Sequence, residues 1–236
     1  MAADLLAQLA ASPERAAILL DVDGTLAPIV ERPEDAGVPP ETRAELERLA
    51  DRYALVACVS GRASADAAAT VGVERLVYVG THGLELEPEA ERWAGALQEF
   101  AAGVAWPAEN KGLSVSFHYR GALDEEAARR ELEGIAATAR AAGLRARFGR
   151  KVLELLPPIE ANKGTATRRL LGERELRRAL YAGDDTTDLD AFRALDGLEL
   201  PVRVAVASPE GPPELRAAAD LVVADPAALL KLLRTL

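Results

Sequence analysis

The chain has 236 residues, of which 49% are hydrophobic and 28% are charged, and its formal net charge is −10. This length allows one domain with a substantial hydrophobic core, or one domain that carries a smaller insertion. An acidic surface repels nucleic acid and anionic membranes, so we expect a small-molecule partner instead. We also expect a monomer.

The single cysteine, Cys58, lies in an apolar run and is expected to be a buried, inert thiol. One cysteine can form neither an intrachain disulfide nor a cysteine-rich zinc site. Residues 1–17 lack the basic region of a signal peptide, and no run of about 18 apolar residues predicts a transmembrane helix. We therefore expect a cytoplasmic protein.

Short apolar runs alternate with helix-like stretches along most of the chain. The runs are too short for helices and most are rich in Val, Ile or Leu, which predicts buried strands at 17–22, 54–59, 76–79, 180–183, 202–207 and 221–224. Helices are predicted between several of them, at 41–51, 63–71, 164–171, 188–196 and 213–219. Strands that are buried on both faces and separated by helices predict an α/β fold with a doubly wound parallel sheet.

The pattern changes between residues 104 and 158. A half-exposed strand at 112–119 and a long helix at 124–142, with Asp124 as its N-cap, are followed by a predicted hairpin around Gly149-Arg150. We therefore predict a smaller α+β domain at 104–158, inserted into a core formed by 1–103 and 159–236.

Polar segments follow several of the predicted strands. In open α/β sheets, ligands bind beyond the carboxyl ends of the strands. These segments are Asp21-Val22-Asp23-Gly24-Thr25, Ser60-Gly61-Arg62, Gly80-Thr81-His82-Gly83 and Gly183-Asp184-Asp185-Thr186-Thr187-Asp188.

Asp21, Asp23 and Asp184 predict a metal site at this edge of the sheet. Asp21 and Asp23 are two residues apart, so in an extended chain they point to the same side. Clustered carboxylates are unfavourable unless a cation compensates them, and a few hard oxygen ligands suit Mg²⁺. The alternative is that Asp21 and Asp23 only form turns or caps, which the other polar strand ends argue against.

Ser60 and Lys163 are candidate phosphate ligands. Ser60 is expected to open a helix, whose first amide groups favour anions, and Lys163 precedes another helix. A lysine supplies a compact positive charge for a phosphate group. The alternative for Lys163 is a solvated helix start.

The order of these motifs resembles the haloacid dehalogenase superfamily of phosphatases, including members with a cap domain inserted between the Ser and the Lys. Several longer strings are similar to the trehalose-6-phosphate phosphatase family, namely residues 20–29, 59–62, 80–85, 111–120 and 162–164. Two positions depart from that family, because Thr81 stands where Asn is expected and Leu156 where Arg is common.

The resemblance implies roles for the acidic residues. Asp21 would be the nucleophile that becomes an aspartyl-phosphate, while Asp23 would protonate the leaving oxygen and then activate water. Mg²⁺ would be held by the carboxylates of Asp21 and Asp184 and by the backbone carbonyl of Asp23. Asp185 or Asp188 would support this shell.

The resemblance also implies where phosphate and sugar bind. The phosphoryl group would contact Ser60, Gly61 and Lys163. The inserted domain would act as a cap that selects the sugar, and the candidate sugar contacts are Arg62, His82, Lys111, His118, Arg120 and Glu154. Arg62 is alternatively a salt-bridge partner near the phosphate, both histidines are alternatively structural, and Arg120 or Glu154 alternatively forms an exposed ion pair.

The implied activity is Mg²⁺-dependent hydrolysis of trehalose 6-phosphate to trehalose and phosphate. Related alternatives are phosphatases of sucrose phosphate, of mannosyl- or glucosyl-phosphoglycerate, or of a hexose phosphate. A non-catalytic regulatory domain is a more distant alternative, and it would be expected to lack Asp21 or Asp184.

Overall fold

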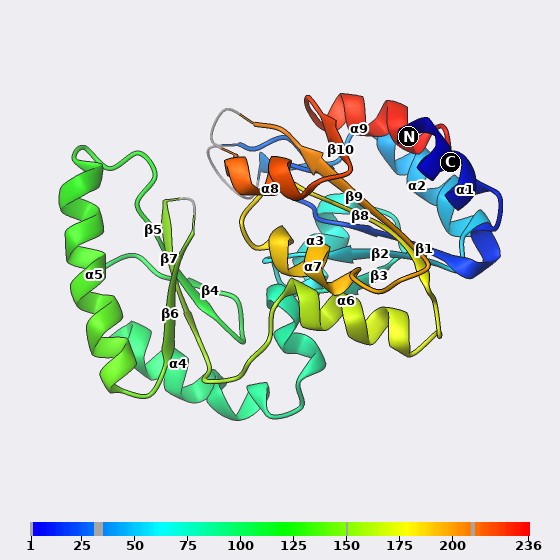
Figure 1. The fold of residues 1–236 in the computed structure, drawn as a ribbon. Coiled ribbons are helices and arrows are strands. Elements are labelled where there is room, and N and C mark those ends of the chain that lie inside the picture. Colours follow the sequence, from blue (N-terminus) through cyan, green and yellow to red (C-terminus); the bar gives the residue numbers. More distant parts are fainter. Residues whose placement is uncertain (1, 31–34, 150, 209–210) are drawn as a thin grey trace. The chain divides into compact units, whose positions relative to one another are not determined.

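The computed structural model describes residues 2–30, 35–149, 151–208 and 211–236 (Figure 1). The chain divides into two compact units, Met1–Gly83 with Ala161–Leu236, and Leu84–Glu160. The predicted insertion, 104–158, lies within the second unit, which also contains helix α4 (Ala94–Ala102). In the predicted hairpin turn, Arg150 lies outside the described residues.

The first unit is built on a six-stranded sheet whose paired strands are all parallel, in the order β10-β9-β8-β1-β2-β3. The strands are β1 (Ala16–Leu20), β2 (Leu55–Val59), β3 (Val77–Val79), β8 (Arg178–Gly183), β9 (Leu200–Val206) and β10 (Leu221–Val223). The predicted doubly wound α/β fold is confirmed.

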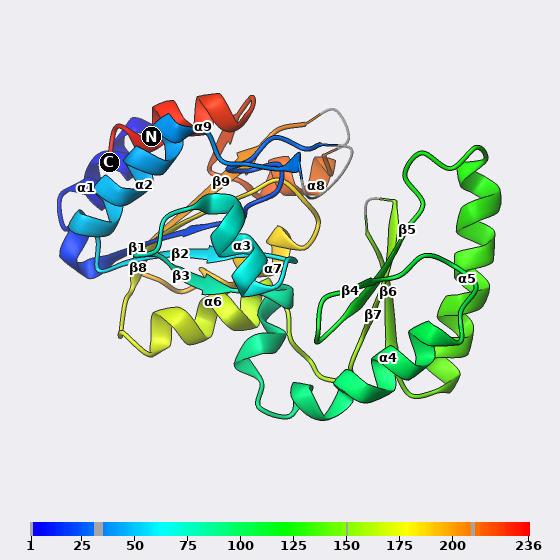
Figure 2. The same cartoon turned by 180° about the vertical axis from the view of Figure 1, so that it is seen from behind.

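Helices cover both faces of this sheet, as Figures 1 and 2 show from opposite sides. One face carries α1 (Ala2–Ala10), α2 (Pro40–Arg52), α3 (Ser64–Val71) and α9 (Pro226–Leu233), and the other carries α6 (Lys163–Gly172), α7 (Asp188–Ala194) and α8 (Pro213–Ala218). Side chains alternate along a strand, so Ile18 and Leu20 of β1 pack in the same core as Leu46 and Leu49 of α2. No helix in the described part of the chain combines the length and the apolar character that a membrane span requires.

The strand register aligns the residues that leave the sheet at its carboxyl edge. Leu20 at the end of β1 pairs with Cys58 of β2 and with Ala182 of β8. The segments that begin at Asp21 and Asp184 therefore leave neighbouring strands at the same level. This edge of the sheet is where polar side chains gather.

The second unit contains a four-stranded sheet in the order β4-β5-β7-β6, with antiparallel neighbours. Its strands are β4 (Glu109–Asn110), β5 (Val115–His118), β6 (Arg145–Gly149) and β7 (Val152–Leu156). Helices α4 and α5 (Glu125–Ala141) pack on one face, where Leu97, Phe117 and Leu132 lie in a separate core. As predicted, Asp124 is the N-cap of α5 and accepts a hydrogen bond from the amide of Ala127.

Candidate active site

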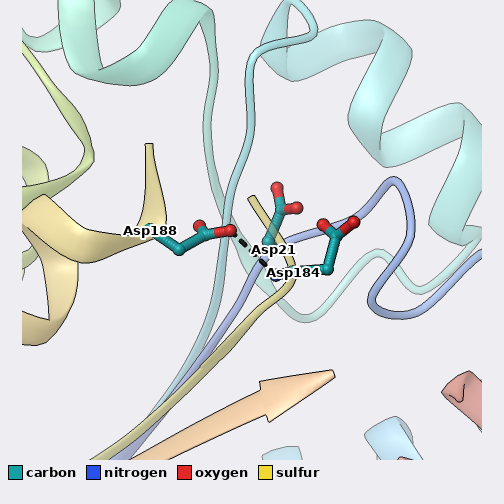
Figure 3. A group of neighbouring side chains, drawn as sticks. All are labelled: Asp21, Asp184 and Asp188. Carbon is teal, nitrogen blue, oxygen red and sulfur yellow. Dashed lines mark hydrogen bonds between the residues drawn. The ribbon is translucent and has the colours of Figure 1, made fainter. Parts of the chain in front are cut away.

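Three buried carboxylates meet at the carboxyl edge of the parallel sheet. Asp21 follows β1, Asp184 follows β8, and Asp188 is the first residue of α7, with one oxygen atom of each lying within 4.8 Å of the others. In Figure 3, the side chain of Asp21 lies between those of Asp184 and Asp188. Gly24, with φ +84°, makes room for this cluster, because a Cβ atom there would lie 2.2 Å from Oδ2 of Asp184.

Lys163 supplies a positive charge to this cluster. Its Nζ atom lies 2.7 Å from Oδ1 of Asp21 and 2.7 Å from Oδ1 of Asp188. The lysine is the first residue of α6, and Asn162 and Thr165 form a capping box that starts this helix. Burial opposes the charge of Lys163, but the carboxylates of Asp188 and Asp21 outweigh burial and raise its pKa. The lysine therefore stays protonated at neutral pH.

The carboxylate of Asp188 is saturated with donors. Oδ1 accepts hydrogen bonds from Lys163 and, at 2.9 Å, from the hydroxyl of Tyr181, while Oδ2 accepts from the amides of Asp184 and Asp185, both at 2.9 Å. Asp188 thus orients Lys163 and the loop after β8. Tyr181 was not predicted as a site residue, because a tyrosine inside an apolar strand has the pattern of an ordinary core residue.

The charge balance of the cluster fits a divalent cation. Burial raises the pKa of Asp21, Lys163 lowers it, and the neighbouring carboxylates of Asp188 and Asp184 raise it again, so the pKa lies well above its usual range. By count of formal charges, the single ammonium group of Lys163 faces the three carboxylates of Asp21, Asp184 and Asp188. Clustered buried oxygen ligands with excess negative charge are suited to a hard divalent metal ion.

Two other predicted metal ligands, Asp23 and Asp185, have different partners. The carboxylate of Asp23 forms a two-point ion pair with Arg62, with Nε to Oδ2 and Nη2 to Oδ1 both at 2.7 Å. Oδ1 of Asp185 accepts a hydrogen bond from the amide of Thr186 at 2.7 Å. Arg62 thus forms the kind of ion pair that its alternative role, a salt-bridge partner near the phosphate, requires, and its sugar contact stays a prediction.

The loop after β2 differs from the prediction. Ser60 is buried but does not open a helix, since α3 begins at Ser64. The carbonyl of Ser60 accepts a hydrogen bond from the amide of His82 at 2.8 Å, and its Oγ accepts from the amide of Arg62 at 3.1 Å. The ring of His82 packs on Gly61, where a Cβ atom would lie 2.6 Å from Nε2. Both predicted roles of His82, a sugar contact or a structural residue, stay predictions.

The second unit has a polar sheet face, opposite the face that packs on α4 and α5. Cross-strand pairing places Glu109, Ser116, Glu154 and Arg147 in one row across all four strands. Glu154 is 5% exposed and forms an ion pair of 2.5 Å with Arg147. The Oγ atom of Ser116 is buried and has no hydrogen-bond partner within the part of the chain that the structure describes.

Two predicted sugar contacts join this polar face through Glu109. Nε2 of His118 lies 2.7 Å and Nζ of Lys111 lies 3.6 Å from Oε2 of Glu109. The hydrogen bond from His118 lowers the pKa of Glu109. A third predicted contact, Arg120, is an exposed residue just beyond β5. Glu109 was missed from the sequence, although its spacing from Lys111 would place both side chains on one face of an extended chain.

Comparison with known proteins supports this description. A model of the trehalose-phosphatase family matches residues 19–106 and 103–212. A trehalose-phosphate phosphatase of Mycobacterium ulcerans is 36% identical over 217 residues, which cover 80% of this chain and 54% of the relative. A protein of Mycobacterium tuberculosis described as an uncharacterized glycosyl hydrolase is 38% identical over 213 residues, covering 77% of this chain and 15% of the relative.

A solved structure, the crystal structure of a trehalose-6-phosphate phosphatase related protein, superposes with a TM-score of 0.73 and 27% identity, covering 92% of this chain and 95% of that one. The parallel sheet, the inserted α+β unit and the acidic edge define a fold of the haloacid dehalogenase type. The match of the family model extends over most of the sequence. The chain belongs to the trehalose-phosphatase family. It spans about half the length of the mycobacterial phosphatase that it matches.

Proposed function

We propose that this chain hydrolyses trehalose 6-phosphate to trehalose and phosphate, with Asp21 as the nucleophile. The observation that carries the proposal is the contact between buried Asp21 and Lys163, at 2.7 Å, beside Asp184 at the carboxyl edge of the sheet. Membership of the trehalose-phosphatase family supports the choice of substrate. A non-catalytic domain is disfavoured because both Asp21 and Asp184 are present.

Each residue of the edge has a distinct part in the proposed reaction. An oxygen atom of Asp21 attacks phosphorus, the bond to the sugar oxygen breaks, and an aspartyl-phosphate forms. The ammonium of Lys163 and the hydroxyl of Ser60 stabilise the negative phosphoryl oxygens. Asp188 holds Lys163 in place through the ion pair described above. Asp23 gives a proton to the sugar oxygen and later takes one from the water that releases phosphate.

Mg²⁺ is the proposed cofactor, held by the carboxylates of Asp21 and Asp184 and by the backbone carbonyl of Asp23. When bound, it would reduce the repulsion between the Asp21 carboxylate and the phosphate dianion. Because Mg²⁺ binds the folded state, it should raise the melting temperature of the protein, by the equivalent of about 2.7 kcal/mol at 100 times Kd. An Asp184→Asn variant should lose this shift. Asp190→Asn should keep it, because the side chain of Asp190 on α7 is 39% exposed and pairs with Arg193. An unchanged shift in Asp184→Asn would contradict the metal assignment.

We further propose that the polar sheet face of the second unit recognises the sugar. A disaccharide carries many hydroxyl groups and needs convergent donors and acceptors. Lys111, His118 and Glu154 supply such groups, and Glu109 and Ser116 on the same face add to them. The buried Oγ of Ser116 is suited to pairing with a ligand hydroxyl or a water molecule.

The substrate is tested by phosphate release from a panel of sugar phosphates at equal concentration. We expect trehalose 6-phosphate to have the highest kcat/KM, followed by sucrose 6-phosphate and hexose phosphates. Glu154→Gln should lower kcat/KM for trehalose 6-phosphate but leave p-nitrophenyl phosphate, which has no sugar, nearly unaffected. Preference for a monosaccharide phosphate would reject trehalose 6-phosphate as the substrate and retain a sugar phosphatase.

We also propose a cytoplasmic location, a monomeric state and a partner that is a small sugar phosphate rather than nucleic acid or a membrane. Cys58 is a buried free thiol, and low cysteine usage fits a reducing compartment. The net charge of −10 supports the absence of nucleic acid.

A further inference from the structure

Arg62 makes a contact that none of the roles proposed above for Asp23 requires. Its guanidinium faces the carboxylate of Asp23 with two parallel hydrogen bonds, each 2.7 Å long. The Arg62 side chain is 15% exposed and that of Asp23 is 42% exposed. The arginine is thus largely fixed, whereas its partner reaches toward solvent.

Hydrogen bonds already fix the main chain at Arg62 and next to Asp23. The amide of Arg62 donates to Oγ of Ser60 at 3.1 Å, and its carbonyl accepts from the amide of Thr81 at 2.7 Å. Next to Asp23, the carbonyl of Val22 accepts from the amides of Leu26 and Ala27, both at 2.9 Å. The remaining freedom of Asp23 is therefore the rotation of its side chain, which the two-point contact with Arg62 removes.

The geometry also leaves the carboxylate able to react. An ionised carboxylate has about four lone-pair sites, and a two-point contact uses one site on each oxygen. One site on each oxygen of Asp23 remains for a proton. Arginine is suited to this task because its planar group fixes the plane of the carboxylate, which a single ammonium cannot do.

We propose that Arg62 is a positioning residue that fixes the orientation of the Asp23 carboxylate for both proton transfers, an inference that rests on the proposed function. In the first step, Asp21 forms a bond to phosphorus, the bond from phosphorus to the leaving oxygen breaks, and the proton of Asp23 moves to that oxygen. In the second step, water attacks phosphorus, the bond to Asp21 breaks, and Asp23 takes back a proton from the water. Arg62 keeps its charge throughout.

The test separates the two steps with p-nitrophenyl phosphate, whose phenolate leaves without a proton. In Arg62→Met, the Asp23 side chain is free to turn away. We expect a rapid release of about one equivalent of p-nitrophenolate per enzyme, followed by slow turnover, because only the second step then needs Asp23. With the sugar phosphate, kcat should fall by about 100-fold, the size of loss typical of a misplaced catalytic group.

Four further variants make this outcome specific. Asp23→Asn should show the same initial release, and the Arg62→Met/Asp23→Asn double variant should be no slower than Asp23→Asn alone, because both changes act through one carboxylate. Arg62→Lys should recover part of the loss through a single contact. Arg177→Met, which removes an exposed arginine of the same unit, is the matched control and should behave like wild type.

Inhibition by inorganic phosphate distinguishes a positioning role of Arg62 from direct binding of the phosphate group by Arg62. If Arg62 binds the phosphate group directly, Arg62→Met should weaken this inhibition, raise KM for both substrates and add its loss to that of Asp23→Asn. If the wild type hydrolyses sugar phosphates, that result, or the absence of the initial release in Arg62→Met, would overturn the proposal for Arg62 alone. A wild type that hydrolyses no phosphate ester would instead contradict the proposed function.

Discussion

Thr81, two residues after the end of β3 (Val77–Val79), is a β-branched residue with a left-handed backbone conformation, at φ 47°. This conformation costs L-residues roughly 1–2 kcal/mol, and Asn tolerates it better than β-branched residues do. We therefore predict that Thr81→Asn, a change to a side chain of similar size, stabilises the protein by about 1 kcal/mol. Denaturation in urea measures the difference in unfolding free energy. A variant that is less stable than wild type would show that the packing of the Thr81 side chain contributes more to stability than the relief of backbone strain.

Lys163 is the buried cation between two carboxylates, so its removal should be severe. Removing one partner of a buried ion pair typically costs about 3–5 kcal/mol, and we expect this loss for Lys163→Met in metal-free buffer. Lys231→Met, an exposed change on α9, is the matched control and should have little effect.

The pH dependence of this loss follows from the raised pKa of Lys163. A lysine whose pKa rises on folding stabilises the fold at every pH below its unfolded value of about 10.4, and the contribution is lost as pH rises through the folded value. The stabilisation that the charge of Lys163 provides relative to Lys163→Met should therefore still be present at about pH 9 and be lost only above about pH 10. A stabilisation that disappears by about pH 8 would contradict the assigned charge.

The N-terminal turn of α6 affects both the stability of this helix and the position of a site residue. Asn162 accepts a hydrogen bond from the amide of Thr165, and the helix that it caps begins with Lys163. Loss of such a cap typically costs about 1 kcal/mol. We predict that Asn162→Ala lowers both stability and kcat, because the first helical turn carries the lysine.

Asp225 provides the matched control for this change. It caps α9 through the amide of Ala228, far along the chain from every candidate site residue. Asp225→Ala should lose about the same stability but keep full activity. Equal kcat in the two variants would show that the cap of α6 does not position Lys163.

Most elements of the first unit could be predicted from local pattern. The apolar runs at 17–22 and 54–59 became β1 and β2 within a residue or two, because strands buried on both faces carry unbroken apolar sequences. Helices α1, α4 and α9 were missed. In α4, only Leu97 is fully buried, and it packs on residues of β5 that are distant in sequence, so tertiary contact rather than local pattern sets this helix.

At the scale of the whole chain, the order of motifs predicted which side chains would meet. Asp21, Asp184 and Lys163 were expected together and lie together, because the carboxyl ends of parallel strands share one edge. A salt bridge of Arg62 was among the predicted alternatives, but its partner, Asp23, was not predicted. The four donors on Asp188 were not predicted either, since they depend on side-chain directions that spacing does not encode.

The proposed reaction begins with attack by Asp21 on the phosphate of trehalose 6-phosphate. Phosphate release from this substrate with excess Mg²⁺, measured side by side for wild type and Asp21→Asn, tests this step. We expect turnover by the wild type and none detectable for the variant, while circular dichroism shows the same fold for both. Phosphate release by Asp21→Asn at the wild-type rate would rule out Asp21 as the nucleophile.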